Sequence, residues 1–221
     1  MTRADVINRL CARRTAPTYL EIGVYRGETF LAVAAARKIG VDPNFRFDIA
    51  EAQRIQPHAS LLSMTSDAFF ALPPVVEGGY DVVFIDGLHH ADQTLRDLLN
   101  AVVWLKPDGV IVLDDMLPPS YHASLANGAH SIQLREHLRD PDQSWMGDVY
   151  RLAFFIDSFL QQFSVATVAG QLLMWRAPRP PERIGQRTIE QVGRIPFEAT
   201  ILERAVFNPC SMDQALALMQ R

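Results

Sequence analysis

The sequence predicts an α/β fold in which buried parallel strands alternate with helices. Two runs of consecutive apolar residues, Val82–Ile85 and Val110–Leu113, are typical of strands that are covered on both faces of a parallel sheet. A third signal lies in Tyr19–Phe30, where β-forming residues lead through Gly23 and Gly27 into a helical pattern. A strand that enters a helix through a glycine turn leaves room for a ligand at the helix N-terminus.

The first part of the chain predicts strand–helix units that are separated by turn residues. The expected elements are a helix over 3–14, a strand over 18–22, a short helix over 28–37, a strand at 39–41, a short helix within 46–58, a strand at 61–64 and a helix over 68–72 that Ser66 or Asp67 would cap.

The second part continues this alternation and ends in a hairpin and a helical tail. The expected elements are a strand at 82–85, a helix over 91–105 with Leu95, Leu98, Leu99, Val102 and Val103 on one side, a turn at 106–109, a strand at 110–113, a long loop over 116–147 with a helical stretch at 132–138, a helix over 147–163, strands at 163–168 and 172–175, and helical periodicity at 189–192 and 212–219. We expect one domain over residues 1–177 and a helical extension over 178–221, which packs on the core or on a second copy of the chain as a homodimer.

Composition limits the classes of partner. The chain has 221 residues, 48% of them apolar, which is enough for one large domain with a substantial core. The net charge of −4 argues against binding to nucleic acids or anionic membranes. The N-terminus lacks the apolar run of a signal peptide, and no stretch approaches the ~20 apolar residues that cross a bilayer. Cys11 and Cys210 have no metal-site spacing, so we expect a cytoplasmic protein.

The residues of the glycine turn indicate the kind of ligand. Val24 and Tyr25 follow Gly23, so the turn lacks the G-x-G-x-x-G pattern of dinucleotide binding. Glu21 lies two residues before Gly23, where its carboxylate would repel a pyrophosphate and suits an ammonium group better. The alternative is that the glycines only allow a strand to pack on a helix.

Two further polar positions follow predicted strands. Asp42 lies 21 residues after Glu21, and its two carboxylate oxygens can accept hydrogen bonds from the two hydroxyls of a ribose. The alternative is a turn aspartate before Pro43. Ser66 and Asp67 come just after the third strand, where either could act as a helix N-cap.

The pattern E-x-G-x-x-x-G from Glu21 to Gly27 resembles motif I of class I S-adenosylmethionine (SAM)-dependent methyltransferases. The segment Tyr80–Asp115, with F-I-D-G-L-H, L-K-P-D-G and a strand that ends in two acids, resembles the second half of that core in bacterial small-molecule methyltransferases. The resemblance covers residues 18–176 and implies a Rossmann-like fold, with a seven-stranded, mostly parallel sheet, helices on both faces and a C-terminal helical arm. It implies a small-molecule acceptor and SAM bound by Glu21, Gly23, Val24, Tyr25, Gly27, Asp42, Ser66, Asp67 and Asp86.

Acidic residues end both of the buried strands. Asp86 follows one of them and Asp114–Asp115 follow the other, and adjacent strands lie about 4.8 Å apart. Carboxylates this close repel one another unless a hard cation such as Mg²⁺ or other groups neutralise them. The sequence is similar here to metal-dependent O-methyltransferases of the catechol and macrocin types, which implies that Asp86, Asp114 and Asp115 bind the metal. The alternative is that Asp115 caps a loop and Asp114 bonds to the backbone.

Asp86 and His89 are the expected catalytic residues. His89 matches the histidine of the D-G-x-H run and is the expected base, because an imidazole titrates close to neutral pH. The alternative is that it only holds its own loop. The predicted function is methyl transfer from SAM to a hydroxyl oxygen, with Mg²⁺ assistance. Two alternatives remain: a metal-independent N-methyltransferase or other SAM-using enzyme, and a non-catalytic cofactor-binding or interaction protein.

Overall fold

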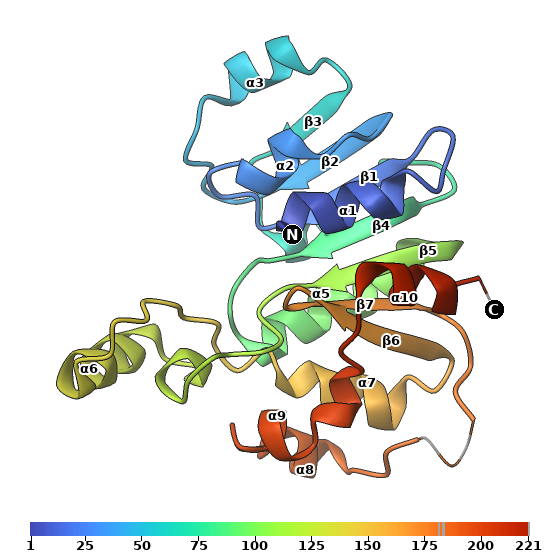
Figure 1. Ribbon diagram of the computed structural model, residues 1–221. Helices are drawn as coiled ribbons and strands as arrows, with labels where there is room; N and C mark the ends of the chain where they lie inside the picture. Colours follow the sequence, from blue (N-terminus) through green and yellow to red (C-terminus); the bar gives the residue numbers. More distant parts are fainter. Residues whose placement is uncertain (181, 183, 221) are drawn as a thin grey trace. The chain divides into compact units, whose positions relative to one another are not determined.

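The computed structural model describes residues 1–180, 182 and 184–220. Pro181, Arg183 and Arg221, which belong to the extension expected over 178–221, lie outside the described residues. Seven strands form one mixed sheet in the order β3-β2-β1-β4-β5-β7-β6, so the predicted seven-stranded α/β fold is confirmed (Figure 1). The chain divides into two compact units. Unit 1 comprises residues 1–88 and 96–113, and unit 2 comprises residues 89–95 and 114–221.

Unit 1 contains five parallel strands, and their register brings several carboxyl ends to one level. Ile22 is the partner of both Val41 and Ile85, and Ile85 is the partner of Leu113. In open α/β sheets ligands bind beyond such carboxyl ends. The elements are α1 (Arg3–Cys11), β1 (Thr18–Ile22), α2 (Glu28–Ala32), β2 (Arg37–Val41), α3 (Ile49–Ile55), β3 (Ala59–Leu62), α4 (Ser66–Phe70), β4 (Tyr80–Ile85), α5 (Ala91–Trp104, whose first turn belongs to unit 2) and β5 (Leu105–Leu113).

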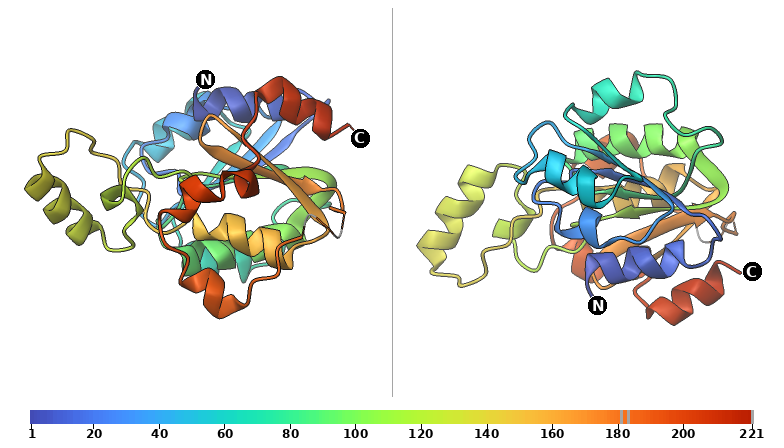
Figure 2. Two further views of the ribbon diagram at one scale, coloured as in Figure 1. Left: turned by 60° about the horizontal axis from the view of Figure 1, so that its bottom comes forward. Right: turned by 90° about the horizontal axis from the view of Figure 1, so that it is seen from above.

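Helices cover both faces of the sheet of unit 1. Asn8 of α1 holds the segment after α2, because its Oδ1 accepts a hydrogen bond from the backbone N–H of Ala34 at 2.7 Å. On α4, the rings of Phe69 and Phe70 lie 5.2 and 5.1 Å from the ring of Trp104 at the end of α5. Figure 2 shows α1 and α5 on opposite faces of these strands.

Unit 2 is built on an antiparallel hairpin, as expected. The C-terminal segment extends it, since the N–H of Thr167 donates to Asn208 O at 3.1 Å and the N–H of Cys210 donates to Thr167 O at 3.0 Å. Helix α6 projects from the rest of this unit (Figures 1 and 2). The elements are η1 (His122–Ser124), α6 (Gly128–Leu138), α7 (Arg151–Phe159), β6 (Phe163–Val168), β7 (Gln171–Arg176), α8 (Ile189–Gly193), α9 (Ala199–Leu202), η3 (Arg204–Phe207) and α10 (Met212–Leu218).

Several element boundaries differ from the sequence prediction. Helix α1 ends at Cys11 rather than at residue 14, and α2 ends at Ala32 because Arg37 already begins β2. The expected turn at 106–109 lies inside β5, and a register shift between Tyr80 and Val82 accommodates it. Helix α7 begins at Arg151 rather than at residue 147, since Gly147 has a positive φ of 65° that a helix cannot include.

The buried face of α5 was also predicted wrongly. Leu99 and Val103 are 43% and 77% exposed. The buried residues are Thr94, Asp97, Leu98 and Ala101, which follow helical spacing but include polar side chains that an apolar pattern overlooks. Over the described ranges, the structure has no helix that is long and apolar enough to span a membrane.

Candidate functional site

The glycine turn after β1 packs tightly against the end of β4. Gly23 has a φ of 88°, and a Cβ atom on it would lie 2.0 Å from the carbonyl oxygen of Asp86. Gly27 has a φ of 76° and is the N-cap of α2. Tyr25 between them also has a positive φ, of 49°. The turn therefore requires glycine at residue 23, and it brings the predicted residues Gly23 and Asp86 together.

Asp42 holds the same turn from the end of β2. Its Oδ2 accepts from the N–H of Tyr25 at 2.8 Å, and its Oδ1 accepts from the N–H of Asn44 at 2.7 Å. These are the turn contacts that sequence analysis gave as the alternative to ribose binding. Each carboxylate oxygen has a second lone pair, so both can still accept from hydroxyl groups. The two roles are compatible, and ribose binding stays a prediction.

Glu21 is deeply buried beneath the turn. Its side chain is 1% exposed, and Tyr19 Oη donates to its Oε2 at 2.5 Å. Burial raises the pKa of Glu21 to about 8, although the hydrogen bond from Tyr19 and the charge of Lys38 act in the opposite direction. At neutral pH the carboxyl group is therefore mostly protonated. A positively charged ligand group beside it would favour the ionised form.

Ser66 and Asp67 begin α4, but neither is its N-cap. Thr65 caps the helix, because its Oγ1 accepts from the N–H of Ala68 at 3.2 Å. The sequence prediction was therefore one residue late. Asp67 forms an ion pair with Arg96 at 3.4 Å, and both side chains are more than half exposed. A contact of Ser66 or Asp67 with a cofactor base stays a prediction.

In unit 2, His89 is fixed by two acceptors. Its Nδ1 lies 2.9 Å from Asp115 Oδ2 and 2.9 Å from the carbonyl oxygen of Trp145. Burial lowers the pKa of His89, but the hydrogen bond and the charge of Asp115 outweigh it, so the pKa is raised above 6.5. Because Nδ1 faces acceptors, it carries the proton, and Nε2 is the proton acceptor of the neutral ring.

Trp145 was not among the predicted site residues. Its indole stacks on the His89 ring, with centroids 5.0 Å apart and planes inclined by 11°. Its Nε1 donates to Leu125 O at 2.7 Å. A Cβ atom on Gly147 would lie 1.7 Å from His89 O, so this loop follows the backbone of His89 closely. Gly147, two residues after Trp145, was the available signal in the sequence. It could not show that Trp145 contacts His89, which lies 56 residues earlier in the chain.

The acids at the end of β5 are both buried. Asp114 and Asp115 are 6% and 7% exposed, and Asp115 has a φ of 59°. Asp114 Oδ1 accepts from Gln171 Nε2 at 3.2 Å. In unit 1, Asp86 Oδ2 lies 3.8 Å from Arg3 Nη1. Donors from the protein therefore offset part of the repulsion that was expected to attract a cation, and metal binding stays a prediction.

Asp148 connects the segment after His89 to α7. Its Oδ1 accepts from the N–H of Ala91, the first residue of α5, at 2.8 Å. Its Oδ2 lies 2.7 Å from Arg151 Nη1. The aspartate therefore caps the helix that follows His89, and it does so through a side chain that α7 holds in place.

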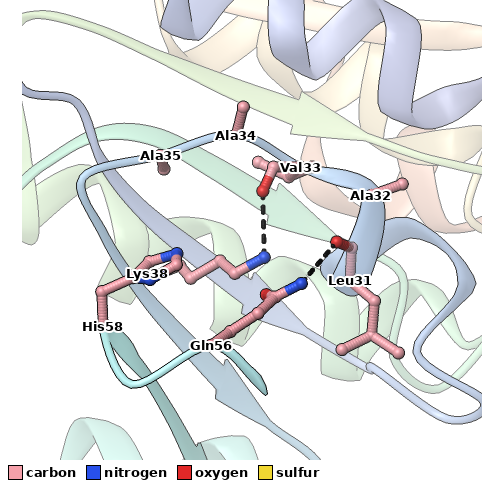
Figure 3. A pocket seen from close by; sticks show the side chains of 8 residues that line it. All are labelled: Leu31, Ala32, Val33, Ala34, Ala35, Lys38, Gln56 and His58. Atoms are coloured by element: carbon pink, nitrogen blue, oxygen red, sulfur yellow. Dashed lines mark hydrogen bonds between the residues drawn. The ribbon is translucent and has the colours of Figure 1, made fainter. Parts of the chain in front are cut away.

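A hollow of about 510 Å³ lies at the amino ends of β2 and β3, away from the carboxyl ends where ligands bind. Lys38 and Gln56 point towards the backbone that lines it (Figure 3). Lys38 Nζ donates to Phe30 O at 2.6 Å and to Val33 O at 2.9 Å, and Gln56 Nε2 donates to Leu31 O at 3.0 Å. These bonds stabilise the end of α2, and we assign the hollow a structural role.

Part of the chain matches a known protein family. Residues 20–116 match the family model described as a methyltransferase domain. That range includes the glycine turn, Asp42, His89 and both acids after β5. A comparison with curated protein sequences found no match.

Solved structures with the same fold include several methyltransferases. TomG from Streptomyces achromogenes, an O-methyltransferase involved in tomaymycin synthesis and solved with SAM, is 16% identical with a TM-score of 0.53, over 79% of each chain. The chain has a SAM-dependent O-methyltransferase-like fold. An O-methyltransferase family protein from Burkholderia thailandensis is 16% identical with a TM-score of 0.53, over 80% of this chain and 56% of that one. Cofactor-bound Rv0187 from MTB is 16% identical with a TM-score of 0.51, over 80% and 79%.

Proposed function

We propose that this protein transfers the methyl group of SAM to a hydroxyl oxygen of a small-molecule acceptor, assisted by Mg²⁺. The observation that carries the proposal is the His89–Asp115 pair, with 2.9 Å between Nδ1 and Oδ2. A buried carboxylate that fixes one nitrogen of an imidazole leaves the other as an oriented proton acceptor. A purely binding function would have no need of such a base.

The glycine turn fits the cofactor. Gly23 and Gly27 allow the positive φ angles of the turn, and the N-terminus of α2 follows it. The buried carboxyl group of Glu21 suits the ammonium group of SAM, and the second lone pairs of Asp42 suit its ribose. The proposed cofactor-binding residues are Glu21, Gly23, Val24, Tyr25, Gly27, Asp42, Ser66, Asp67 and Asp86.

The acids after β4 and β5 fit a hard divalent cation. Ile85 and Leu113, the residues before Asp86 and Asp114, are partners in the β4–β5 register. Carboxylate oxygens are the ligands that Mg²⁺ prefers. We propose Asp86, Asp114 and Asp115 as metal ligands. The ion would bind the acceptor hydroxyl and lower its pKa.

The protein's contribution to the reaction is orientation and proton transfer. The sulfonium of SAM supplies an already activated methyl group, so alignment of the acceptor oxygen accounts for much of the rate. His89 Nε2 accepts the proton of the hydroxyl as the oxygen attacks. Asp115 then stabilises the imidazolium that forms, while Trp145 keeps the ring in its plane.

Calorimetric titration with SAM, with and without Mg²⁺, tests the proposal. We expect micromolar binding that Asp42→Ala weakens, and turnover that is lost in His89→Gln, in Asp114→Asn and with chelator. Turnover that resists the chelator would favour a metal-independent N-methyltransferase. SAM binding without turnover of any hydroxyl acceptor would favour a non-catalytic protein. Absence of SAM binding by the unmodified protein would refute the methyltransferase assignment.

A further inference from the structure

A two-residue turn in unit 2 places Gln171 at the start of β7. Ala169 and Gly170 form the turn, with positive φ values of 50° and 91°. Val168 and Gln171, on either side of them, are register partners. Positive φ at both central residues is typical of tight hairpin turns, whose twist matches that of the strands. The turn therefore fixes the position of Gln171, whose side chain is buried with 6% of its surface exposed.

The side-chain amide of Gln171 holds Asp114, a proposed metal ligand of the same unit. Gln171 Nε2 donates to Asp114 Oδ1 at 3.2 Å. Because an amide carries no charge, this bond orients the carboxylate without adding a positive charge beside it. Asp148 shows the other arrangement for a buried aspartate in this unit, since its Oδ2 lies 2.7 Å from Arg151 Nη1. An amide partner suits an acid that binds a cation better than a guanidinium does.

The oxygen of the same amide is buried, and over the residues that the structure describes it has no hydrogen-bond partner. Buried acceptors are nearly always paired, with protein groups or with ordered water. The reverse orientation of the amide would not relieve this, because Gln171 Oε1 would then face the carboxylate oxygen of Asp114, and two acceptors repel each other. A bound water is the simplest donor, since it can donate to Oε1 and keep its own oxygen for another partner.

We infer that Gln171 is a positioning residue of the proposed metal site. Its Nε2 orients Asp114 towards the cation, and its Oε1 accepts a hydrogen bond from a water molecule that the cation binds. Mg²⁺ usually keeps several of its waters in proteins. The inference rests on the proposed function, because it takes Asp114 as a metal ligand. It adds the residue that fixes this ligand, and loss of such a residue typically lowers metal affinity by about tenfold to 100-fold.

Gln171→Met tests the inference, because methionine has nearly the same length but has a thioether in place of the amide. The probe is Mg²⁺ alone, titrated calorimetrically into the protein without SAM. We expect the variant to bind Mg²⁺ at least about tenfold more weakly than the unmodified protein does. Mg²⁺ should also raise the melting temperature of the unmodified protein more than that of the variant, since tighter binding stabilises the folded state more.

The EPR spectrum of bound Mn²⁺ supplies a measurement that a purely structural role of Gln171 would not change. Mn²⁺ suits the same carboxylate and water ligands as Mg²⁺. The spectrum depends on the arrangement of the ligand oxygens. It should therefore differ between the unmodified protein and Gln171→Met when both are saturated with Mn²⁺. Identical spectra would mean that the amide does not orient Asp114, and they would overturn the inference.

Thr167→Val is the matched control, because it removes a buried hydrogen bond from the same hairpin. Thr167 is 4% exposed, and its Oγ1 donates to Phe207 O at 2.6 Å. This variant should unfold at a lower urea concentration, whereas its Mg²⁺ affinity should change less than about threefold. If Gln171→Met does not fold, Gln171→Asn provides the same test, because its amide is one methylene too short to reach Asp114 in the same way.

A folded Gln171→Met that binds Mg²⁺ as tightly as the unmodified protein would overturn the inference, and so would an equal loss of affinity in Thr167→Val. Both outcomes leave the proposed function standing. If the unmodified protein binds SAM but no Mg²⁺, the inference fails together with metal assistance, while methyl transfer from SAM remains. If it binds Mg²⁺ but no SAM, and Gln171→Met weakens Mg²⁺ binding, the methyltransferase proposal fails and the role of Gln171 at a cation site is supported.

Discussion

Replacement of Glu21 by glutamine tests whether the acid beneath the glycine turn is neutral. Glutamine keeps the shape of the side chain and an oxygen that accepts from Tyr19 Oη, but it cannot ionise. Burial raises the pKa of Glu21 from 4.5 to about 8. The folded state therefore binds this proton more tightly than the unfolded chain does. As pH rises from 4.5 towards 8, the free energy of unfolding should fall.

The size of the effect follows from this pKa difference. It corresponds to about 5 kcal/mol over the whole range, of which about 2 to 3 kcal/mol falls between pH 5 and pH 7. Glu21→Gln removes this dependence. The variant should therefore gain stability relative to the original protein by that amount between the two pH values. Below pH 7 Lys38, whose pKa burial lowers to about 8, stays mostly protonated and disturbs the comparison little.

The assay is urea denaturation of both proteins at pH 5, 6 and 7, because every other titrating group is common to both. A difference between the two unfolding free energies that does not change with pH would refute the reasoning. It would mean that Glu21 is ionised when folded, stabilised by Lys38 or by solvent. The same pair of proteins should differ in proton release when SAM binds at pH 7, since only the original protein has a carboxyl group to deprotonate.

Three further predictions concern single contacts. Gly23→Ala should abolish SAM binding in calorimetry and lower the free energy of unfolding by about 2 kcal/mol or more. The reason is that its Cβ atom would lie 2.0 Å from Asp86 O at a φ of 88°. Unchanged SAM affinity would contradict the proposal that the glycine turn binds SAM. Tyr19→Phe leaves Glu21 without its 2.5 Å donor and should cost about 1 to 3 kcal/mol in denaturation at pH 7. Trp145→Phe keeps the backbone carbonyl that accepts from His89 but removes the hydrogen bond to Leu125 O. We therefore expect kcat to fall about tenfold while SAM affinity stays the same. An equal loss of SAM affinity would indicate that the substitution disturbs the fold as a whole.

Local sequence patterns predicted the parts of the fold that depend on neighbours in the chain. The limits of β1 at Thr18–Ile22 and of β6 at Phe163–Val168 were predicted correctly, because apolar runs and turn residues define them. The N-cap of α4 was missed by one residue, since Thr65, Ser66 and Asp67 are all good caps and only backbone geometry selects among them. The face of α5 was missed because its buried side includes Asp97, which is 1% exposed.

The candidate site divides in the same way. Gly23 and Tyr25 are close to Glu21 in the chain, so one short motif contains that part of the site. His89 depends on Asp115 and Trp145, which are far from it in sequence, and no spacing rule links them. The sequence could therefore name the histidine and the acid, but not the indole that orients the imidazole. It also could not show that Glu21 and Lys38 are both almost fully buried.

The cofactor turn and the supports of the proposed base depend on different segments of the chain. A cofactor is the same in every relative that uses it, so a fixed turn with short-range contacts suffices to bind it. The loop after β5 and the segment that leads into α7 can change while the strands stay unaltered. In this chain these two segments also support His89, through Leu125–Trp145 and Asp148–Ala91. Substitutions of Leu125 or Asp148 should therefore alter the orientation of the proposed base, whereas SAM affinity should stay unchanged.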